Sequence, residues 1–271
     1  MHARVGRLLF VPLLLLSNIQ PVRAACIDPA QFVHSTVSIM RHFDDAERDE
    51  RPDLIGVRGT AWFLSPTTIV TVEHVSAGMK LSAEIWKPLE IVDGESSQFI
   101  AARIQRLAGA QAERLAVIEL QRAVSDARSF AIRKEPLVPE QQVITLAYPA
   151  GRLQPVSGRF VRLGDDGKLT GMALLEFYEG DNRLIIDHGA SGAPVIDCNG
   201  RVAAVVSNVF TQSIQGVSRE VRISTAWGTP NVVSVPAQVL DDFSKAELEV
   251  LQLNSSAAYA NRIDGGAGLP R

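Results

Sequence analysis

The stretch Gly189-Ala190-Ser191-Gly192-Ala193-Pro194 decides the fold expected for this chain. It places one serine between glycines, which permit a tight turn in which the backbone N–H groups of Gly189 and Ser191 point at one spot. A serine hydroxyl is a weak nucleophile at neutral pH unless a base takes its proton. A histidine, the usual base, ends a strand-like run in Thr71-Val72-Glu73-His74-Val75. The two stretches predict acyl transfer, with Ser191 as nucleophile and His74 as general base.

Four stretches in this order resemble the trypsin-like serine peptidases, and among them the bacterial secreted and periplasmic branch. Gly59-Thr60-Ala61-Trp62-Phe63-Leu64-Ser65-Pro66 resembles the strand before the family's histidine, and Thr71 to Val75 resembles its histidine motif. Arg114 to Leu120 resembles its central strand, and Gly189 to Pro194 its G-x-S-G-x-P serine motif. The resemblance covers roughly residues 34 to 240.

This resemblance implies an all-β fold of two packed six-stranded antiparallel β-barrels, chymotrypsin-like, with the site between them. Many short strands separated by close turns favour barrels or sandwiches on their own account. The implied activity is hydrolysis of peptide bonds in a polypeptide substrate, with no cofactor. The N–H groups of Gly189 and Ser191 are expected to form the oxyanion hole.

The main departure from the family is Arg114, which stands where the family has the triad aspartate. Neighbouring residues on a strand face opposite ways, so Glu113 reaches His74 only through a bulge or an irregular strand end. An arginine directed at His74 would disfavour the imidazolium that forms during acylation. Glu73 is either a substitute partner of His74 or a surface charge. Two interpretations therefore remain. The first is a serine endopeptidase, whose activity is either ordinary or weak. The second is a degenerate peptidase fold that binds peptides or proteins.

The resemblance also suggests a substrate preference. The base of the specificity pocket is expected about six residues before the serine, at Ile185, and the channel along Ser207-Asn208-Val209. His188 either lines this substrate site or is an ordinary turn histidine. An apolar pocket leaves a lysine or arginine side chain buried without a partner. We therefore expect a small or medium apolar residue before the scissile bond.

The beginning of the chain predicts the compartment. Arg4 and Arg7 precede the apolar run Leu8 to Leu16, which is followed by Val22-Arg23-Ala24-Ala25. This order is typical of a secretory signal peptide. The apolar run is shorter than the roughly 20 helical residues that cross a bilayer, although a retained anchor is the alternative. We expect a secreted or periplasmic protein with no membrane attachment after cleavage.

Composition excludes some other classes of protein. The formal net charge is −3 and no basic stripe occurs, which argues against nucleic-acid binding. His34 and His42 lack the close spacing of metal ligands, so no metal is expected. In an oxidising compartment Cys26 and Cys198 either pair or remain separate thiols, since sequence does not supply the distance between them. The sequence gives no indication of oligomeric state.

Turn signals divide the chain into two β-rich halves. Pro136 and Pro139 mark the linker, and Asn199-Gly200 is a two-residue hairpin signal. The charged segment 42–53 is expected to be a solvated loop. The predicted organisation is a signal peptide (1–25), a barrel carrying the histidine (26–135), a barrel carrying the serine plus a helix over Pro236–Leu253 (136–253), and a disordered tail (254–271) too short for a PDZ domain. Expected strands are Phe32–Met40, Val57–Leu64, Thr68–Val72, Leu81–Val92, Gln98–Leu107, Leu115–Leu120, Gln142–Ala147, Pro155–Leu163, Leu174–Tyr178, Arg183–Ile186, Val195–Asp197, Arg201–Val206, Glu220–Ser224 and Asn231–Val235.

Overall fold

The structure, a computed structural model, describes residues 26–50, 52–105, 114–165, 169–177, 189–209 and 230–240. The expected signal peptide, the strands at 183–186 and 220–224, the tail and all but the first turn of the expected C-terminal helix lie outside these residues. Within them, no helix has the length and apolarity needed to cross a bilayer.

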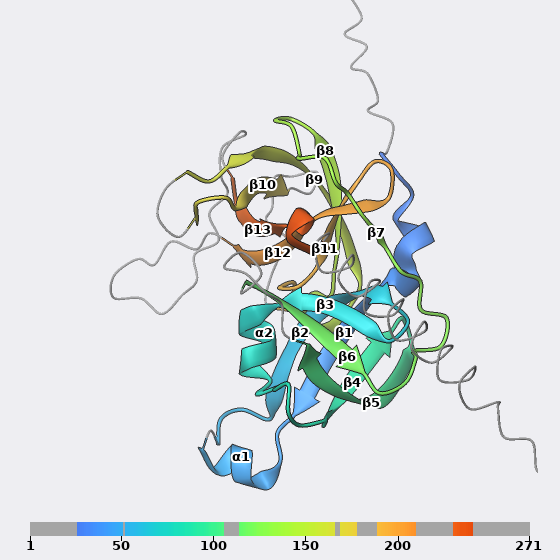
Figure 1. Cartoon of the computed structure of the whole chain (residues 1–271), viewed down its shortest axis with the longest axis vertical. Helices are drawn as coiled ribbons and strands as arrows, with labels where there is room; N and C mark the ends of the chain where they lie inside the picture. The colour runs from blue at the N-terminus through green and yellow to red at the C-terminus, as the bar shows by residue number, and fades with distance from the viewer. Residues whose placement is uncertain are drawn as a thin grey trace, which may run out of the picture.

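The first half of the chain forms a closed antiparallel barrel (Figure 1). Strand alternation places one face inward; in β4, for example, Leu89 and Ile91 are fully buried between more exposed neighbours. Around the barrel the order is β1-β2-β3-β6-β5-β4. The strands are β1 (Thr36–His42), β2 (Gly56–Ser65), β3 (Thr68–Val72), β4 (Lys87–Asp93), β5 (Ser96–Gln105) and β6 (Leu115–Leu120).

The second half forms a second barrel, which closes because β11 pairs with both β8 and β12. Within the described residues, the predicted pair of six-stranded antiparallel barrels is therefore confirmed. A short strand, β7 (Ala131–Ile132), adds to β12 in parallel. The barrel strands are β8 (Gln142–Ala147), β9 (Gln154–Leu163), β10 (Ala173–Phe177), β11 (Pro194–Asp197), β12 (Arg201–Val209) and β13 (Val232–Pro236).

The two barrels share one continuous apolar core. It contains buried side chains of the first barrel, such as Trp62 and Val72, together with Leu146 and Val235 of the second. A smaller cluster around Phe160 and Phe177 fills the second barrel alone. Because the interface is apolar and continuous, the loops at the junction are supported from both sides.

Short helices complete the described fold. They are η1 (Pro29–Ser35), α1 (Asp45–Glu50), α2 (Glu73–Gly78), η3 (Pro149–Gly151) and η5 (Ala237–Leu240). The expected strand from Phe32 begins only at Thr36, because η1 starts at Pro29 with its first N–H groups capped by Asp28. In the expected C-terminal helix, the described first turn is the 3-10 turn η5.

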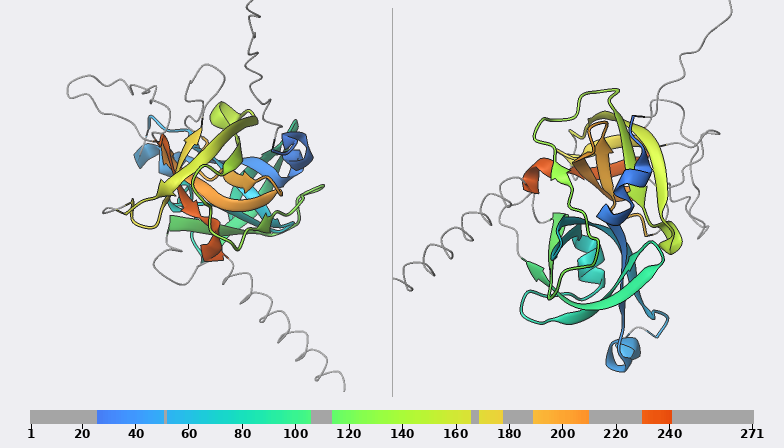
Figure 2. Two further views of the ribbon diagram at one scale, coloured as in Figure 1. Left: turned by 90° about the horizontal axis from the view of Figure 1, so that it is seen from above. Right: turned by 90° about the vertical axis from the view of Figure 1, so that its right-hand side faces the viewer.

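Residues 42–53 were expected to form a solvated loop. This expectation is wrong in part, because the segment contains the exposed helix α1. This helix buries no residue and projects from the end of the first barrel, away from the second (Figure 2). The buried guanidinium of Arg41 anchors it, with Nη2 donating to both carboxylate oxygens of Glu47 at 2.8 and 2.6 Å. Burial raises the pKa of Glu47, but hydrogen bonds from Arg41, Asp44 and Lys87 outweigh it and lower the value to about 2.

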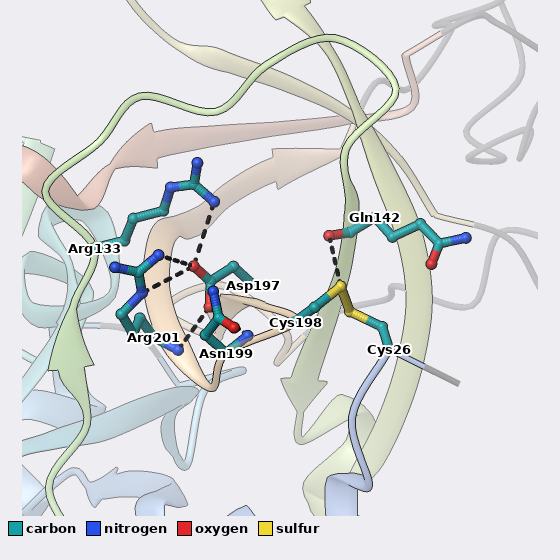
Figure 3. Close-up of a disulfide and its surroundings, with 7 residues drawn as sticks. All are labelled: Cys26, Arg133, Gln142, Asp197, Cys198, Asn199 and Arg201. Atoms are coloured by element: carbon teal, nitrogen blue, oxygen red, sulfur yellow. Dashed lines mark hydrogen bonds and ion pairs between the residues drawn. A yellow bond between two sulfur atoms is a disulfide. The ribbon is translucent and has the colours of Figure 1, made fainter. Parts of the chain in front are cut away.

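The N-terminal segment is tied to the second barrel by a disulfide between Cys26 and Cys198, with a Cα–Cα distance of 4.8 Å (Figure 3). Of the two alternatives for these cysteines, the structure has the paired one. Next to the bridge, the buried Asp197 carboxylate accepts from Arg201 Nη2 at 2.8 Å and from Arg133 Nη1 at 3.3 Å. Its other oxygen accepts from the backbone N–H of Asn199 at 2.9 Å. These bonds fix the β11–β12 hairpin, which the Asn-Gly signal had predicted.

Candidate active site

The serine stretch forms a tight loop that leads directly into β11. Gly189 and Gly192 have φ of +98° and +92°, which is left-handed backbone that favours glycine. The N–H of Ala193 donates to the Ala190 carbonyl at 3.0 Å, and the N–H of Gly192 donates to the Val206 carbonyl at 2.8 Å. The loop is therefore closed on itself and held to β12.

His74 is the second residue of helix α2, which directly follows β3. β3 ends at Val72, and α2 starts at Glu73 without a side-chain cap. The His74 residue is exposed, but partial desolvation of its imidazole lowers the pKa below 6.5, against the opposing effect of the Glu73 charge. The ring is therefore mainly neutral at neutral pH, which is the form that accepts a proton.

Gly59 on β2 lies between the serine loop (residues 189–194) and helix α2, which carries His74. A Cβ built there would lie 2.6 Å from Val75 Cγ1 and 3.4 Å from the Ser191 carbonyl oxygen. The next residue, Thr60, donates its N–H to that same carbonyl at 2.9 Å. The side chain of Val75, the residue after His74, and the backbone carbonyl of Ser191 therefore both lie beside Gly59.

The Ser191 hydroxyl donates to the backbone carbonyl of Ser207 on β12, at 3.1 Å. Ser207 itself is 8% exposed. Among the described residues, the His74 ring has no hydrogen-bond partner, so the Ser191 hydroxyl must turn away from Ser207 before it can donate to His74. In the structure the Ser191 hydroxyl is therefore bonded to the residue expected to line the substrate channel.

Neither of the two expected oxyanion donors has a hydrogen-bond acceptor among the described residues. Within the described ranges, the backbone N–H groups of Gly189 and Ser191 donate to no other group, whereas Gly192 and Ala193 are hydrogen-bonded. Unpaired N–H groups on a glycine turn beside a serine suit an oxygen that gains negative charge.

Arg114 directly precedes β6. The β3–β6 register pairs Val72 with Leu115, so Arg114 stands one step further on, level with the start of α2. Its Nη1 is buried and has no hydrogen-bond partner in the described part of the chain. A cation therefore stands near the position where the family has a carboxylate.

Three residues considered for the site cannot be placed. Glu113, Ile185 and His188 all lie outside the described residues. In the part of the chain that the structure describes, no group of three or more His, Cys, Asp or Glu side chains gathers as metal ligands.

Sequence reasoning missed two buried residues, Thr60, which is hydrogen-bonded to the serine loop, and Tyr148, which is hydrogen-bonded to Thr60. The backbone N–H of Tyr148 donates to Thr60 Oγ1 at 3.0 Å, and Thr60 Oγ1 donates to the Gly189 carbonyl at 2.6 Å. Thr60 lies inside a stretch that the sequence had singled out, but only as a strand. No spacing or composition signal links it to a loop far away in the chain.

Comparison with known families agrees with this geometry. Residues 59–205 match the family of trypsin-like peptidase domains, and the chain belongs to that family. Two solved structures similar to this chain are those of the Rv3671c protease from M. tuberculosis. The active form shares 17% sequence identity over 89% of this chain and 92% of that one, with a TM-score of 0.55. The inactive form shares 18% over 80% and 91%, with a TM-score of 0.52. At this identity the likeness establishes the chymotrypsin-like fold. A search of curated proteins finds no match.

Proposed function

We propose that this chain is a serine-type endopeptidase. The observation that supports the proposal is the attachment of the Ser191 carbonyl to β2 at Thr60, next to Gly59, whose other neighbour is the side chain of Val75, the residue after His74. Ser191 Oγ attacks the peptide carbonyl while His74 takes the hydroxyl proton, and the N–H groups of Gly189 and Ser191 stabilise the oxyanion. His74 then returns the proton to the leaving amine, and water hydrolyses the acyl-enzyme by the same route in reverse.

The proposed substrate is a polypeptide with a small or medium apolar residue before the scissile bond. This preference rests on Ile185 as the expected pocket base, with His188 expected to line the site. The Ser207 carbonyl accepts a hydrogen bond from the Ser191 hydroxyl, so the same oxygen can accept a hydrogen bond from a substrate N–H once the hydroxyl turns toward His74. A lysine or arginine ester emerging as the best substrate in a panel would contradict this preference.

The proposed compartment is extracellular or periplasmic. The Cys26–Cys198 disulfide supports it, because such bonds persist in oxidising environments. The basic and apolar start of the chain supports the same location.

The proposal is tested by digesting a pool of peptides with the secreted, disulfide-bonded protein and sequencing the products by mass spectrometry. Ser191→Ala and His74→Ala should each abolish cleavage while leaving the thermal transition close to that of the parent. Cleavage that persists in Ser191→Ala would contradict the mechanism.

One observation favours a second function, a degenerate peptidase fold that binds peptides or partner proteins. Arg114 directly precedes β6, level with the start of α2, and its buried Nη1 has no hydrogen-bond partner among the described residues; a cation near His74 opposes formation of the imidazolium. Arg114→Asp separates the two functions. A large gain of cleavage in this variant, from a parent without activity, would favour the binding module; a modest change in an active parent would favour the enzyme.

A further inference from the structure

We infer that Thr60 is a positioning residue for the oxyanion loop, holding Gly189 and Ser191 in place from the opposite barrel. This inference rests on the proposed function for its effect on rate, but its structural part can be tested without activity.

All three polar atoms of Thr60 are used at the junction of the barrels. Its N–H donates to the Ser191 carbonyl at 2.9 Å, and its hydroxyl donates to the Gly189 carbonyl at 2.6 Å. Its own carbonyl accepts from Thr71 Oγ1 at 2.8 Å. Thr60 is fully buried, so water cannot substitute for these partners.

The hydroxyl also accepts from the Tyr148 N–H at 3.0 Å, which extends the connection into the second barrel. Tyr148 is itself anchored on the first barrel, because its phenol donates to the Thr36 carbonyl at 3.3 Å. One hydroxyl thus links β2, the end of β8 and the serine loop. Only a side chain that both donates and accepts can fill this place.

The loop depends on these bonds because both of its oxyanion residues are held through their carbonyls. Gly189 has a left-handed backbone with no side chain of its own to fix it. Loss of the Thr60 hydroxyl would leave the Gly189 carbonyl and the buried Tyr148 N–H unpaired. A loop that can then rotate no longer aims the Gly189 N–H at the reacting oxygen, and small misplacements of this kind reduce rate sharply.

The test compares Thr60→Val, which keeps the shape and removes the hydroxyl, with Thr60→Ser, which restores it. The matched control is Thr145→Val, because Thr145 is also fully buried and its hydroxyl also donates to a backbone carbonyl, that of Pro194 at 2.9 Å. One readout is hydrogen exchange of the Gly192 and Ala193 amides by mass spectrometry of the disulfide-bonded protein. The other is the rate of labelling by a fluorophosphonate, with Ser191→Ala as blank.

We expect Thr60→Val to raise the exchange rate of the loop by about tenfold or more and to slow labelling by about tenfold or more. Thr60→Ser should lie within about threefold of the parent in both readouts, and Thr145→Val should not loosen the loop. Loop exchange in Thr60→Val no faster than in the parent would overturn the inference. An unlabelled parent would overturn the proposed function instead, and exchange alone would then decide whether Thr60 holds the loop.

Discussion

Replacing Gly192 by alanine tests most directly how tightly the serine loop is packed. A Cβ at this position would lie 2.0 Å from the Thr60 carbonyl oxygen and 2.2 Å from Thr71 Oγ1. Real Cβ atoms do not approach other atoms so closely, and both neighbours are buried within the barrel. The loop must therefore move away from β2 to accommodate a methyl group.

The expected loss of stability has two parts. A left-handed φ of +92° costs an alanine about 1–2 kcal/mol, and overpacking a closed site adds about 1–3 kcal/mol. The sum is about 2–5 kcal/mol, which for a chain of this size lowers the melting temperature by roughly 5–20 °C. Labelling of Ser191 by a fluorophosphonate should fall as well, because the oxyanion donors move with the loop.

Gly94→Ala is the matched control. Gly94 also has a left-handed φ, +59°, but a Cβ there would meet nothing within 4 Å. The free energy of unfolding of this variant should fall only by the cost of the left-handed backbone, about 1–2 kcal/mol. Its labelling rate should equal that of the parent. Differential scanning calorimetry of both proteins gives the comparison. Equal losses in the two variants would refute the close packing of the serine loop against β2.

Three further perturbations test the disulfide, the Arg41–Glu47 ion pair and the charge next to His74. Serine at both Cys26 and Cys198 should lower the free energy of unfolding in urea by about 2–5 kcal/mol, and reductant should then have no further effect. The pKa of Glu47 lies near 2, so its contribution to stability is complete above about pH 4.5 and is lost as pH falls toward 2; Glu47→Gln should flatten that part of an acid titration. The Glu73 charge raises the pKa of His74, so Glu73→Gln should move the rising limb of the labelling-rate profile to lower pH. An unmoved limb would show that Glu73 does not act on His74.

Local signals were sufficient to predict a β-rich fold of short strands, and the resemblance to the trypsin-like serine peptidases supplied the choice of two barrels. Alternating strands, the Asn199-Gly200 turn and the glycines around Ser191 each specify backbone geometry within a few residues. α1 was missed because it buries nothing and has no apolar periodicity; it is fixed instead by the pairing of Arg41 with Glu47.

The site was predictable only in part, for a physical reason. Residue type and spacing were sufficient to propose Ser191, His74 and the flanking glycines as site residues. Thr60 and Tyr148 act through hydrogen bonds between residues 88 and 129 positions apart, which no local pattern encodes. The pairing of the cysteines likewise needed a distance, which only the fold supplies.

The proposed function requires Ser191 to be an activated nucleophile. The most direct measurement is the intact mass of the disulfide-bonded protein after incubation with a fluorophosphonate, beside Ser191→Ala. We expect one stoichiometric adduct on the parent, mapped to Ser191, and none on the variant. Absence of an adduct in folded protein from about pH 6 to 9, a range in which the His74 base becomes neutral, would contradict it.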